Sequence, residues 1–135
     1  MSTIVEFFIA PGDDAAAAVA DHGPDGVYET AQYGNFSPDI AMGEWESALG
    51  IAGDGRPRTV AVGSSFVVAA SAALQATLAA ADDERLAEAA VRWAGLRADD
   101  GEEIDPEFAG DILSEVASLA RTAAECDHRL YCWWG

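Results

Sequence analysis

The stretch DPEFAGDILSEVASLARTAAECDHRLYCWW, residues 105–134, decides the fold class of this chain. Its first part has the pattern of an amphipathic helix that begins at Asp105-Pro106-Glu107. Apolar side chains recur at helical spacing and predict one buried face, formed by Phe108, Ile112, Val116, Leu119 and Ala123. Polar side chains fall on the opposite face and predict its exposure to solvent, namely those of Asp111, Ser114, Glu115, Ser118 and Thr122.

The same stretch ends in a strand, because side chains over residues 128–134 alternate between two faces. Residues 3–10 predict a second strand with apolar side chains on both faces. Strands that are apolar on both faces are usually covered on both sides, so we expect these terminal strands near the middle of a sheet. Adjacent Trp133 and Trp134 must then face opposite sides of that sheet. A long helix beside such strands indicates an α+β protein.

The segments between the terminal strands alternate between short helices and short strands. We expect helices over residues 13–21 and 38–49, a helix capped by Ser71, and another that begins at Asp82. The apolar stripe of this last helix is formed by Leu86, Ala89, Ala90, Trp93 and Leu96. We expect strands over residues 27–33, 59–62 and 65–70, the last two forming either two strands or one strand with a bulge at Gly63. The chain is thus predicted to be a single α+β domain, residues 1–135, with a mixed sheet and about five helices packed on it. Phe7, Trp93, Ile112 and Val116 should be among its most buried residues.

The order of elements in the C-terminal half resembles one known family. Residues 66–74 are a strand followed by a serine-capped helix, then come residues 83–86 (DERL) and 104–106 (IDP), and a long helix leads to an aromatic strand. This order is similar to that of the YfbM-like family of small bacterial α+β proteins, whose function is unknown. The resemblance implies the fold, and it implies no activity and no site residue.

The charge balance excludes one large class of partner. Lys+Arg is 7 and Asp+Glu is 24, which gives a formal net charge of -17. So few arginines cannot neutralise nucleic-acid phosphates beside so many carboxylates, so we expect no nucleic-acid partner. With 2 cysteines and a chain long enough for a core, a disulfide-stapled miniprotein is also excluded. Because no signal peptide or membrane-spanning run is evident, we expect a cytoplasmic bacterial protein with reduced thiols and no membrane partner.

The candidate metal and nucleophile groups lack the expected spacing. Cys126, His128 and Cys132, with distant His22, do not follow a standard zinc pattern. His128 and Cys132 are about 13 Å apart along a strand, too far for a nucleophile and its base. The acidic segment 99–107 lacks the alternating ladder of a calcium-binding loop. We therefore predict no catalytic, cofactor-binding or metal-binding residue.

Aromatic side chains among carboxylates suggest a protein-binding surface instead, because tyrosine and tryptophan are common anchors at interfaces. Trp45, with flanking Glu44 and Glu46, is the first candidate for such a surface. A tryptophan provides a large apolar anchor, and carboxylates steer a cationic partner. Trp45 also shares a helix face with Ala41 and Leu49, so the alternative is that it anchors the core. The candidate partner-binding residues are Tyr28, Tyr33, Glu44, Trp45, Glu46 and Trp134.

Two functions remain open at this point. The first is a non-enzymatic acidic interaction protein, such as an immunity protein, an antitoxin or an inhibitor, that binds a basic protein. The second is a small-molecule-binding domain or an enzyme with a pocket between the sheet and the helices. An aromatic-lined pocket with convergent polar groups would favour the second, and a flat acidic surface with exposed aromatic side chains would favour the first.

Overall fold

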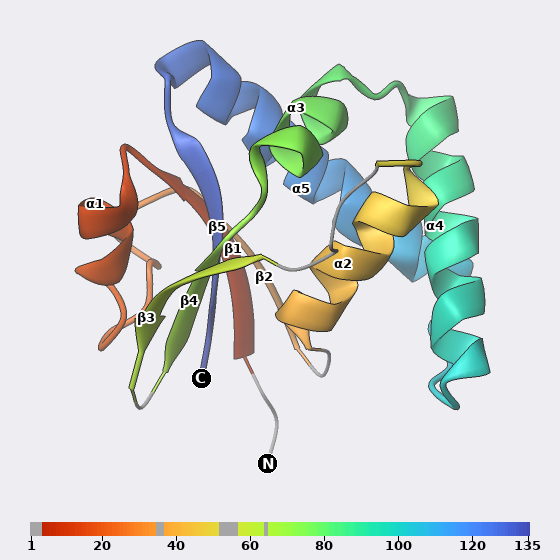
Figure 1. The fold of residues 1–135 in the computed structure, drawn as a ribbon, viewed down its shortest axis with the longest axis horizontal. Helices are drawn as coiled ribbons and strands as arrows, with labels where there is room; N and C mark the ends of the chain where they lie inside the picture. Colours follow the sequence, from red (N-terminus) through yellow and green to blue (C-terminus); the bar gives the residue numbers. More distant parts are fainter. Residues whose placement is uncertain (1–3, 35–36, 52–56, 64) are drawn as a thin grey trace.

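The protein forms a five-stranded sheet whose neighbouring strands are all antiparallel (Figure 1). The structure is a computed structural model, and it describes residues 4–34, 37–51, 57–63 and 65–135. The sheet has the order β2-β1-β5-β4-β3. Its strands are β1 (Ile4–Ala10), β2 (Thr30–Gly34), β3 (Arg58–Val62), β4 (Phe66–Ala69) and β5 (Arg129–Trp134). The terminal strands β1 and β5 lie next to each other inside the sheet, which confirms their predicted place.

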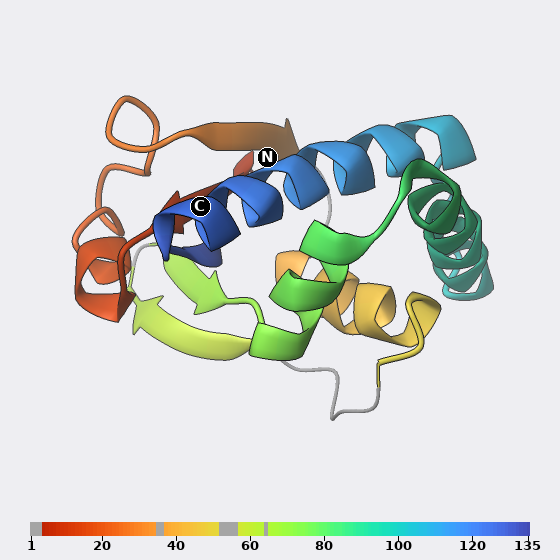
Figure 2. The ribbon, with the colours of Figure 1, turned by 90° about the horizontal axis from the view of Figure 1, so that it is seen from above.

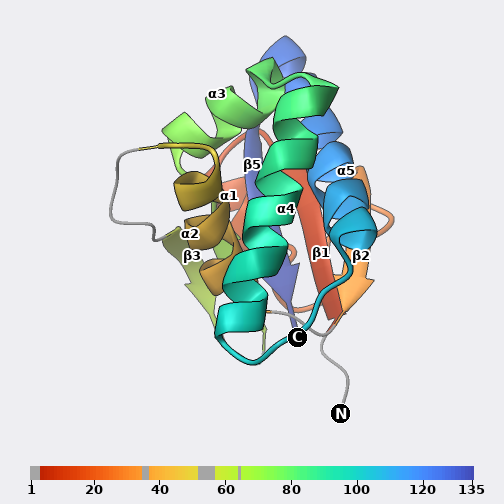
Figure 3. The ribbon, with the colours of Figure 1, turned by 90° about the vertical axis from the view of Figure 1, so that its right-hand side faces the viewer.

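Helices cover both faces of the sheet, and most of them lie on one side (Figures 1 and 2). The helices are α1 (Asp13–Ala17), α2 (Pro38–Ala48), α3 (Ala72–Ala80), α4 (Asp83–Asp99) and α5 (Pro106–Cys126). Helix α1 lies alone on one face, and α2, α3 and α5 lie on the other (Figure 2). Helix α4 packs on α2 and α5 as an outer layer (Figure 3). Among the described residues, no helix has both the length and the apolar character that crossing a bilayer requires.

The α+β class is confirmed, and the pairing within the sheet differs from the prediction of a mixed sheet. Ala69, the last residue of β4, pairs with Tyr131 near the start of β5. The helical connection between these strands therefore leaves the end of β4 and returns to β5 at the same end of the strand pair. The two strands consequently run antiparallel. Strands β3 and β4 form a hairpin as two separate strands, and the irregularity lies between Thr59 and Ala61 rather than at Gly63.

Each face of the sheet carries its own hydrophobic core. The larger core lies under α2–α5, and the four side chains predicted to be most buried, Phe7, Trp93, Ile112 and Val116, are all fully buried in it. The smaller core lies under α1 and the segment that follows it, and it contains Phe8, Ala16, Val19, Val67 and Tyr131. Successive residues of β1 alternate between these cores, as the pleat of a strand requires.

The predicted caps of α3 and α4 agree with the structure, whereas the predicted end of α1 and the predicted start of β2 do not. Ser71 and Asp82 cap α3 and α4, each accepting a hydrogen bond from a backbone N–H of the first turn. Helix α1 ends at Ala17 rather than Asp21, because the chain continues through turns that close on the carbonyl of Val19. Strand β2 begins at Thr30, three residues later than predicted.

The buried stripes of α4 and α5 each differ from the prediction at one end. On α4, Arg97 is buried in place of the half-buried Leu96, because Arg97 meets carboxylates that compensate its charge. On α5, Phe108 is 45% exposed. Its contact is the edge of the Tyr33 ring at the end of β2, with ring centroids 6.3 Å apart. Arg97 and Phe108 line the same hollow, which belongs to the site described next.

Candidate protein-binding surface

Trp45 is a core residue. Its side chain is 0% exposed and packs edge-on against Trp93, with ring centroids 5.3 Å apart, and against Phe7 at 5.4 Å. The face that Trp45 shares with Ala41 and Ala48 points toward α4 and the sheet. This burial corrects the hypothesis that Trp45 anchors a partner and supports the alternative that it anchors the core.

Glu44 forms part of a charge network inside the fold. Its carboxylate accepts hydrogen bonds from the indole N–H of Trp93 at 3.2 Å and from Nη2 of Arg97 at 2.8 Å. Arg97 also pairs with Asp100 at 2.5 Å and with Glu102 at 3.0 Å. Glu44, and to a smaller extent Glu102, raises the pKa of the Arg97 guanidinium further above its ordinary value. Glu44 therefore holds α2 against α4, which corrects its assignment to an exposed frame around Trp45.

Glu46 is buried on the other side of α2. Its Oε1 accepts a hydrogen bond of 2.5 Å from the hydroxyl of Ser71, the residue that caps α3. Glu46 thus links α2 to the start of α3, while Glu44 links α2 to α4. The structure separates the two glutamates and directs both into the protein, so they do not frame a common surface.

Tyr28 and Trp134 are half-buried on opposite sides of the sheet. The ring of Tyr28 stacks on Phe8 with centroids 5.9 Å apart, on the side of the smaller core. Trp134 stacks on Phe66 at 5.1 Å, on the side of the larger core. Trp133 faces the smaller core and donates its indole N–H to the carbonyl of Ala20 at 2.8 Å. The two adjacent tryptophans therefore face opposite sides, as predicted.

Tyr33 and Trp134 belong to one row of side chains across the sheet. Tyr33 pairs with Val5, Val5 with Trp134, Trp134 with Phe66, and Phe66 with Val62. Directly paired residues share a face, so this row runs over all five strands. Val5 in its middle is fully buried, whereas Phe66 and Val62 are exposed at one end. Tyr33, at the other end, contacts α5.

The contact of Tyr33 with α5 brings aromatic and acidic side chains together. Phe108, Asp111 and Glu115 are spaced at i, i+3 and i+7, which places them along one side of α5. Burial, and to a smaller extent the nearby carboxylates of Glu115 and Asp111, raises the pKa of the Tyr33 hydroxyl. We call Tyr33, Ile104 and Phe108, with the carboxylates around them, the acidic aromatic surface; those carboxylates are Glu102, Glu103, Asp105, Glu107, Asp111 and Glu115.

A hollow of about 420 Å³ opens within the acidic aromatic surface, between the end of α4 and the start of α5. Its apolar wall is formed by Ile104, Phe108 and Trp93, and Gly34 closes one side. Its polar rim is formed by Glu102, Glu103 and Asp105, and Arg97 lies at its base. The acidity of segment 99–107 is evident in the sequence. The site was not predicted, because the helical spacing of Phe108 indicates a buried side chain.

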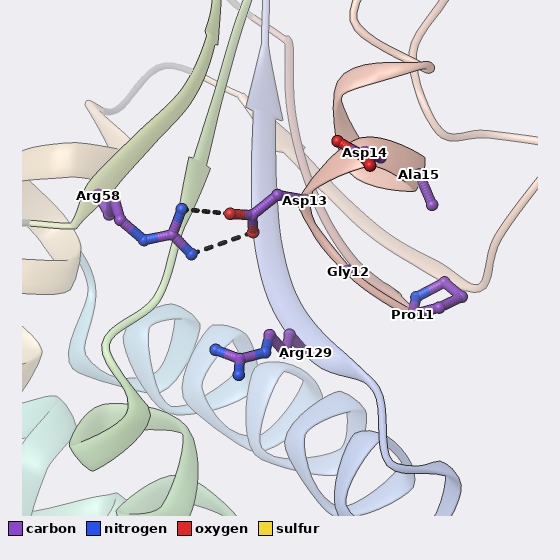
Figure 4. A pocket seen from close by; sticks show the side chains of 7 residues that line it. All are labelled: Pro11, Gly12, Asp13, Asp14, Ala15, Arg58 and Arg129. Atoms are coloured by element: carbon purple, nitrogen blue, oxygen red, sulfur yellow. Dashed lines mark hydrogen bonds and ion pairs between the residues drawn. The ribbon is translucent and has the colours of Figure 1, made fainter.

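A second hollow, of about 550 Å³, lies beside α1 (Figure 4). Asp13 accepts two hydrogen bonds from Arg58, of 2.5 and 3.0 Å, and a third from the hydroxyl of Tyr131 at 2.9 Å. Arg58 is the main cause of the lowered pKa of Asp13, whereas burial is the main cause that raises the pKa of Tyr131 to about 12. The side chain of Arg129 extends into the same hollow (Figure 4). No sequence pattern pointed to this arrangement, because its residues are separated by many positions along the chain.

The side chains considered for metal binding do not meet in the structure. Within the described part of the chain, no three His, Cys, Asp or Glu side chains are grouped so that they could hold a metal ion. Cys126 is exposed, and Cys132 is buried in β5, where burial raises the pKa of its thiol. Comparison of the chain with protein-family models, with curated proteins and with solved structures gave no match. The resemblance to the YfbM-like family therefore stays a prediction.

Proposed function

We propose that this protein is a non-enzymatic interaction protein that binds a basic protein partner through the acidic aromatic surface. An immunity protein, an antitoxin and an inhibitor are functions of this kind. The observation that carries the proposal is the exposed ring of Phe108 beside Tyr33, above an apolar hollow whose rim is acidic. We place the protein in the cytoplasm as part of the same proposal, and its free cysteines support that place.

The surface combines the two features that protein recognition needs. An exposed aromatic ring next to a hollow provides apolar area at small entropic cost. The carboxylates around it provide a negative field that speeds encounter with a cationic partner. Arg97 does not cancel this field, because its single charge is outnumbered by the three carboxylates paired with it, Glu44, Asp100 and Glu102.

The hollow also suggests which side chains the partner presents. Arginine and lysine carry a charged group on an apolar stem. Such a stem fits against Ile104 and Phe108, and the charged group would then reach Glu103 and Asp105 at the rim. The competing hypothesis places a small-molecule pocket between the sheet and the helices. In the described structure the larger core, including Phe7, occupies most of that layer, and the hollow of about 290 Å³ between α3, α5 and the start of β5 is lined by no phenylalanine, tyrosine or tryptophan.

The test is a comparison of variants during affinity capture from the source cells. Phe108→Ala removes the exposed ring, and Glu115→Gln removes one carboxylate of the same surface. Val91→Ala and Glu88→Gln are the matched controls, because both side chains are exposed on α4 and lie outside the surface. We expect a basic protein that the wild type and both controls retain, and that the Phe108 variant loses.

Binding kinetics with that protein then separate the two contributions. Phe108→Ala should raise the dissociation rate, whereas Glu115→Gln should lower the association rate and its dependence on salt. Capture that is equal for all four variants, or loss of an acidic protein instead of a basic one, would contradict the proposal. Circular dichroism of each variant shows whether it remains folded.

A further inference from the structure

Most arginines of this protein have a clear structural role. Arg85 and Arg92 donate to the carbonyls of Leu49 and Ala48, at the C-terminal end of α2. Arg121 donates to the carbonyls of Ala79 and Ala81, at the end of α3. Carbonyl groups at a helix C-terminus lack partners within the helix, and cations there are favourable. These arginines therefore hold helix ends together.

Of the other arginines that the structure describes, Arg58 and Arg97 are paired with carboxylates and Arg129 is not. Arg97 pairs with Glu44, Asp100 and Glu102, and Arg58 forms a bidentate ion pair with Asp13. Arg129 makes no hydrogen bond or ion pair with any residue that the structure describes. Among the arginines that the structure describes, Arg129 is the one whose side chain bonds neither a carbonyl group nor a carboxylate.

Arg129 is exposed and lines a wide, open hollow. Its guanidinium extends into the second hollow toward the same space as that of Arg58, whereas Asp14 points away from both (Figure 4). Asp13 is already occupied by Arg58 and Tyr131. Pro11 and Ala15 add apolar walls. The hollow thus offers one guanidinium that is not bonded to a carboxylate, together with apolar lining residues.

We propose that the second hollow binds a small organic monocarboxylate, with Arg129 as the group that recognises it. A guanidinium presents two parallel N–H groups whose spacing matches a carboxylate. Because Asp13 compensates Arg58, the guanidinium of Arg129 can balance a monoanion, whereas a dianion such as phosphate would keep one negative charge without a partner in the hollow. The organic part of the ligand would lie against Pro11 and Ala15. This site lies beside α1 and is independent of the acidic aromatic surface.

The test is a titration with benzoate followed by two-dimensional ¹H–¹⁵N NMR, with chloride used to hold the ionic strength constant. We expect saturable shifts at the backbone amide of Gly12 and at the side-chain N–H of Arg129. Arg129→Gln should weaken the affinity by about tenfold or more, because a charge-assisted pair is lost. Arg129→Lys keeps the positive charge but lacks the planar, bidentate guanidinium, so it should weaken the affinity for benzoate less than Arg129→Gln does. Ser114→Glu, an exposed change on α5 with the same effect on net charge, should leave the affinity unchanged.

Each other outcome contradicts a defined part of the proposal. Shifts that grow linearly with benzoate, or equal affinity in Arg129→Gln, would show that no site centred on Arg129 exists. Inorganic phosphate that binds more tightly than benzoate would overturn the assignment to carboxylates. The spectra also report whether each variant is folded, so loss of binding is not confused with loss of structure.

Discussion

Replacing Glu44 by glutamine tests whether its carboxylate supports the fold. The substitution keeps the size of the side chain and removes its charge. In the folded protein the carboxylate faces the Trp93 indole N–H and the guanidinium of Arg97, whose Nε lies 2.7 Å from Oε1. A glutamine amide has one acceptor and one donor, so its NH₂ group would meet one of these donors. One hydrogen bond is therefore lost, together with the main charge that compensates Arg97.

The size of the loss follows from the burial of the network. Arg97 and Glu44 have side-chain exposures of 10% and 17%, and breaking a buried pair by removing one partner costs about 3–5 kcal/mol. Asp100 and Glu102 remain beside Arg97, but they are 64% and 63% exposed and so compensate it only in part. We therefore expect a loss of about 2 kcal/mol in the free energy of unfolding. A urea slope of about 1–3 kcal/mol per M converts this loss into a midpoint lower by about 1 M.

Urea unfolding followed by tryptophan fluorescence measures this midpoint. Glu88→Gln on the exposed side of α4 is the control, and it should change stability by no more than about 0.5 kcal/mol. The double variant Glu44→Gln/Arg97→Met should lose less than the sum of the single variants, because it also removes the uncompensated charge. A midpoint for Glu44→Gln equal to that of Glu88→Gln would refute the structural role of Glu44.

Three more predictions concern the core, the buried acid and the net charge. Ile112→Ala should lower the free energy of unfolding by about 2–5 kcal/mol in chemical denaturation, because the side chain is fully buried; an unchanged midpoint would place the wrong face of α5 in the core. Burial, and to a smaller extent the charge of Asp25, raises the pKa of Glu6, so its ionisation opposes folding as the pH rises from about 4.5 toward neutrality. Glu6→Gln should therefore gain stability relative to the wild type over that range in pH-dependent melts, whereas the exposed control Glu29→Gln should show no such trend. Stability should also rise from about 0.01 M to about 0.15 M salt in thermal melts, as screening weakens repulsion among carboxylates, and a fall would show that ion pairs dominate.

The fold was predictable where local patterns agree with tertiary packing. Apolar residues on both faces of residues 3–10 and 128–134 placed these strands inside the sheet, because only central strands are covered on both sides. The periodicity of α5 identified Ile112 and Val116 as core residues. Ser71 and Asp82 marked helix starts because their side chains satisfy backbone N–H groups that the helix leaves free.

The candidate surface was only partly predictable, because burial depends on what the rest of the chain places above a residue. Helical spacing gave Phe108 and Ile112 the same apolar face, yet Phe108 lies in the first turn of α5 and remains exposed. Hydropathy favours Leu96 over Arg97 in a core, and that order is reversed because two nearby carboxylates and the distant Glu44 converge on Arg97. Tyr33 was identified by its residue type, but its neighbours could not be, since the contact with α5 is set by tertiary packing.

The roles of the arginines explain why the acidic surface keeps its charge. Arg85, Arg92 and Arg121 donate to helix carbonyls, and Arg97 is buried among carboxylates. Arg97 pairs with Asp100 and Glu102 of segment 99–107, and the other three arginines cannot turn toward that segment without breaking contacts between helices. Asp105, Glu107 and Asp111 are therefore left without compensating arginines among the described residues, so their charge acts on solvent and on an approaching partner. Arg85, Arg92 and Arg121 are thus held at helix ends, and Arg97, which lines the hollow, is outnumbered by the carboxylates around it.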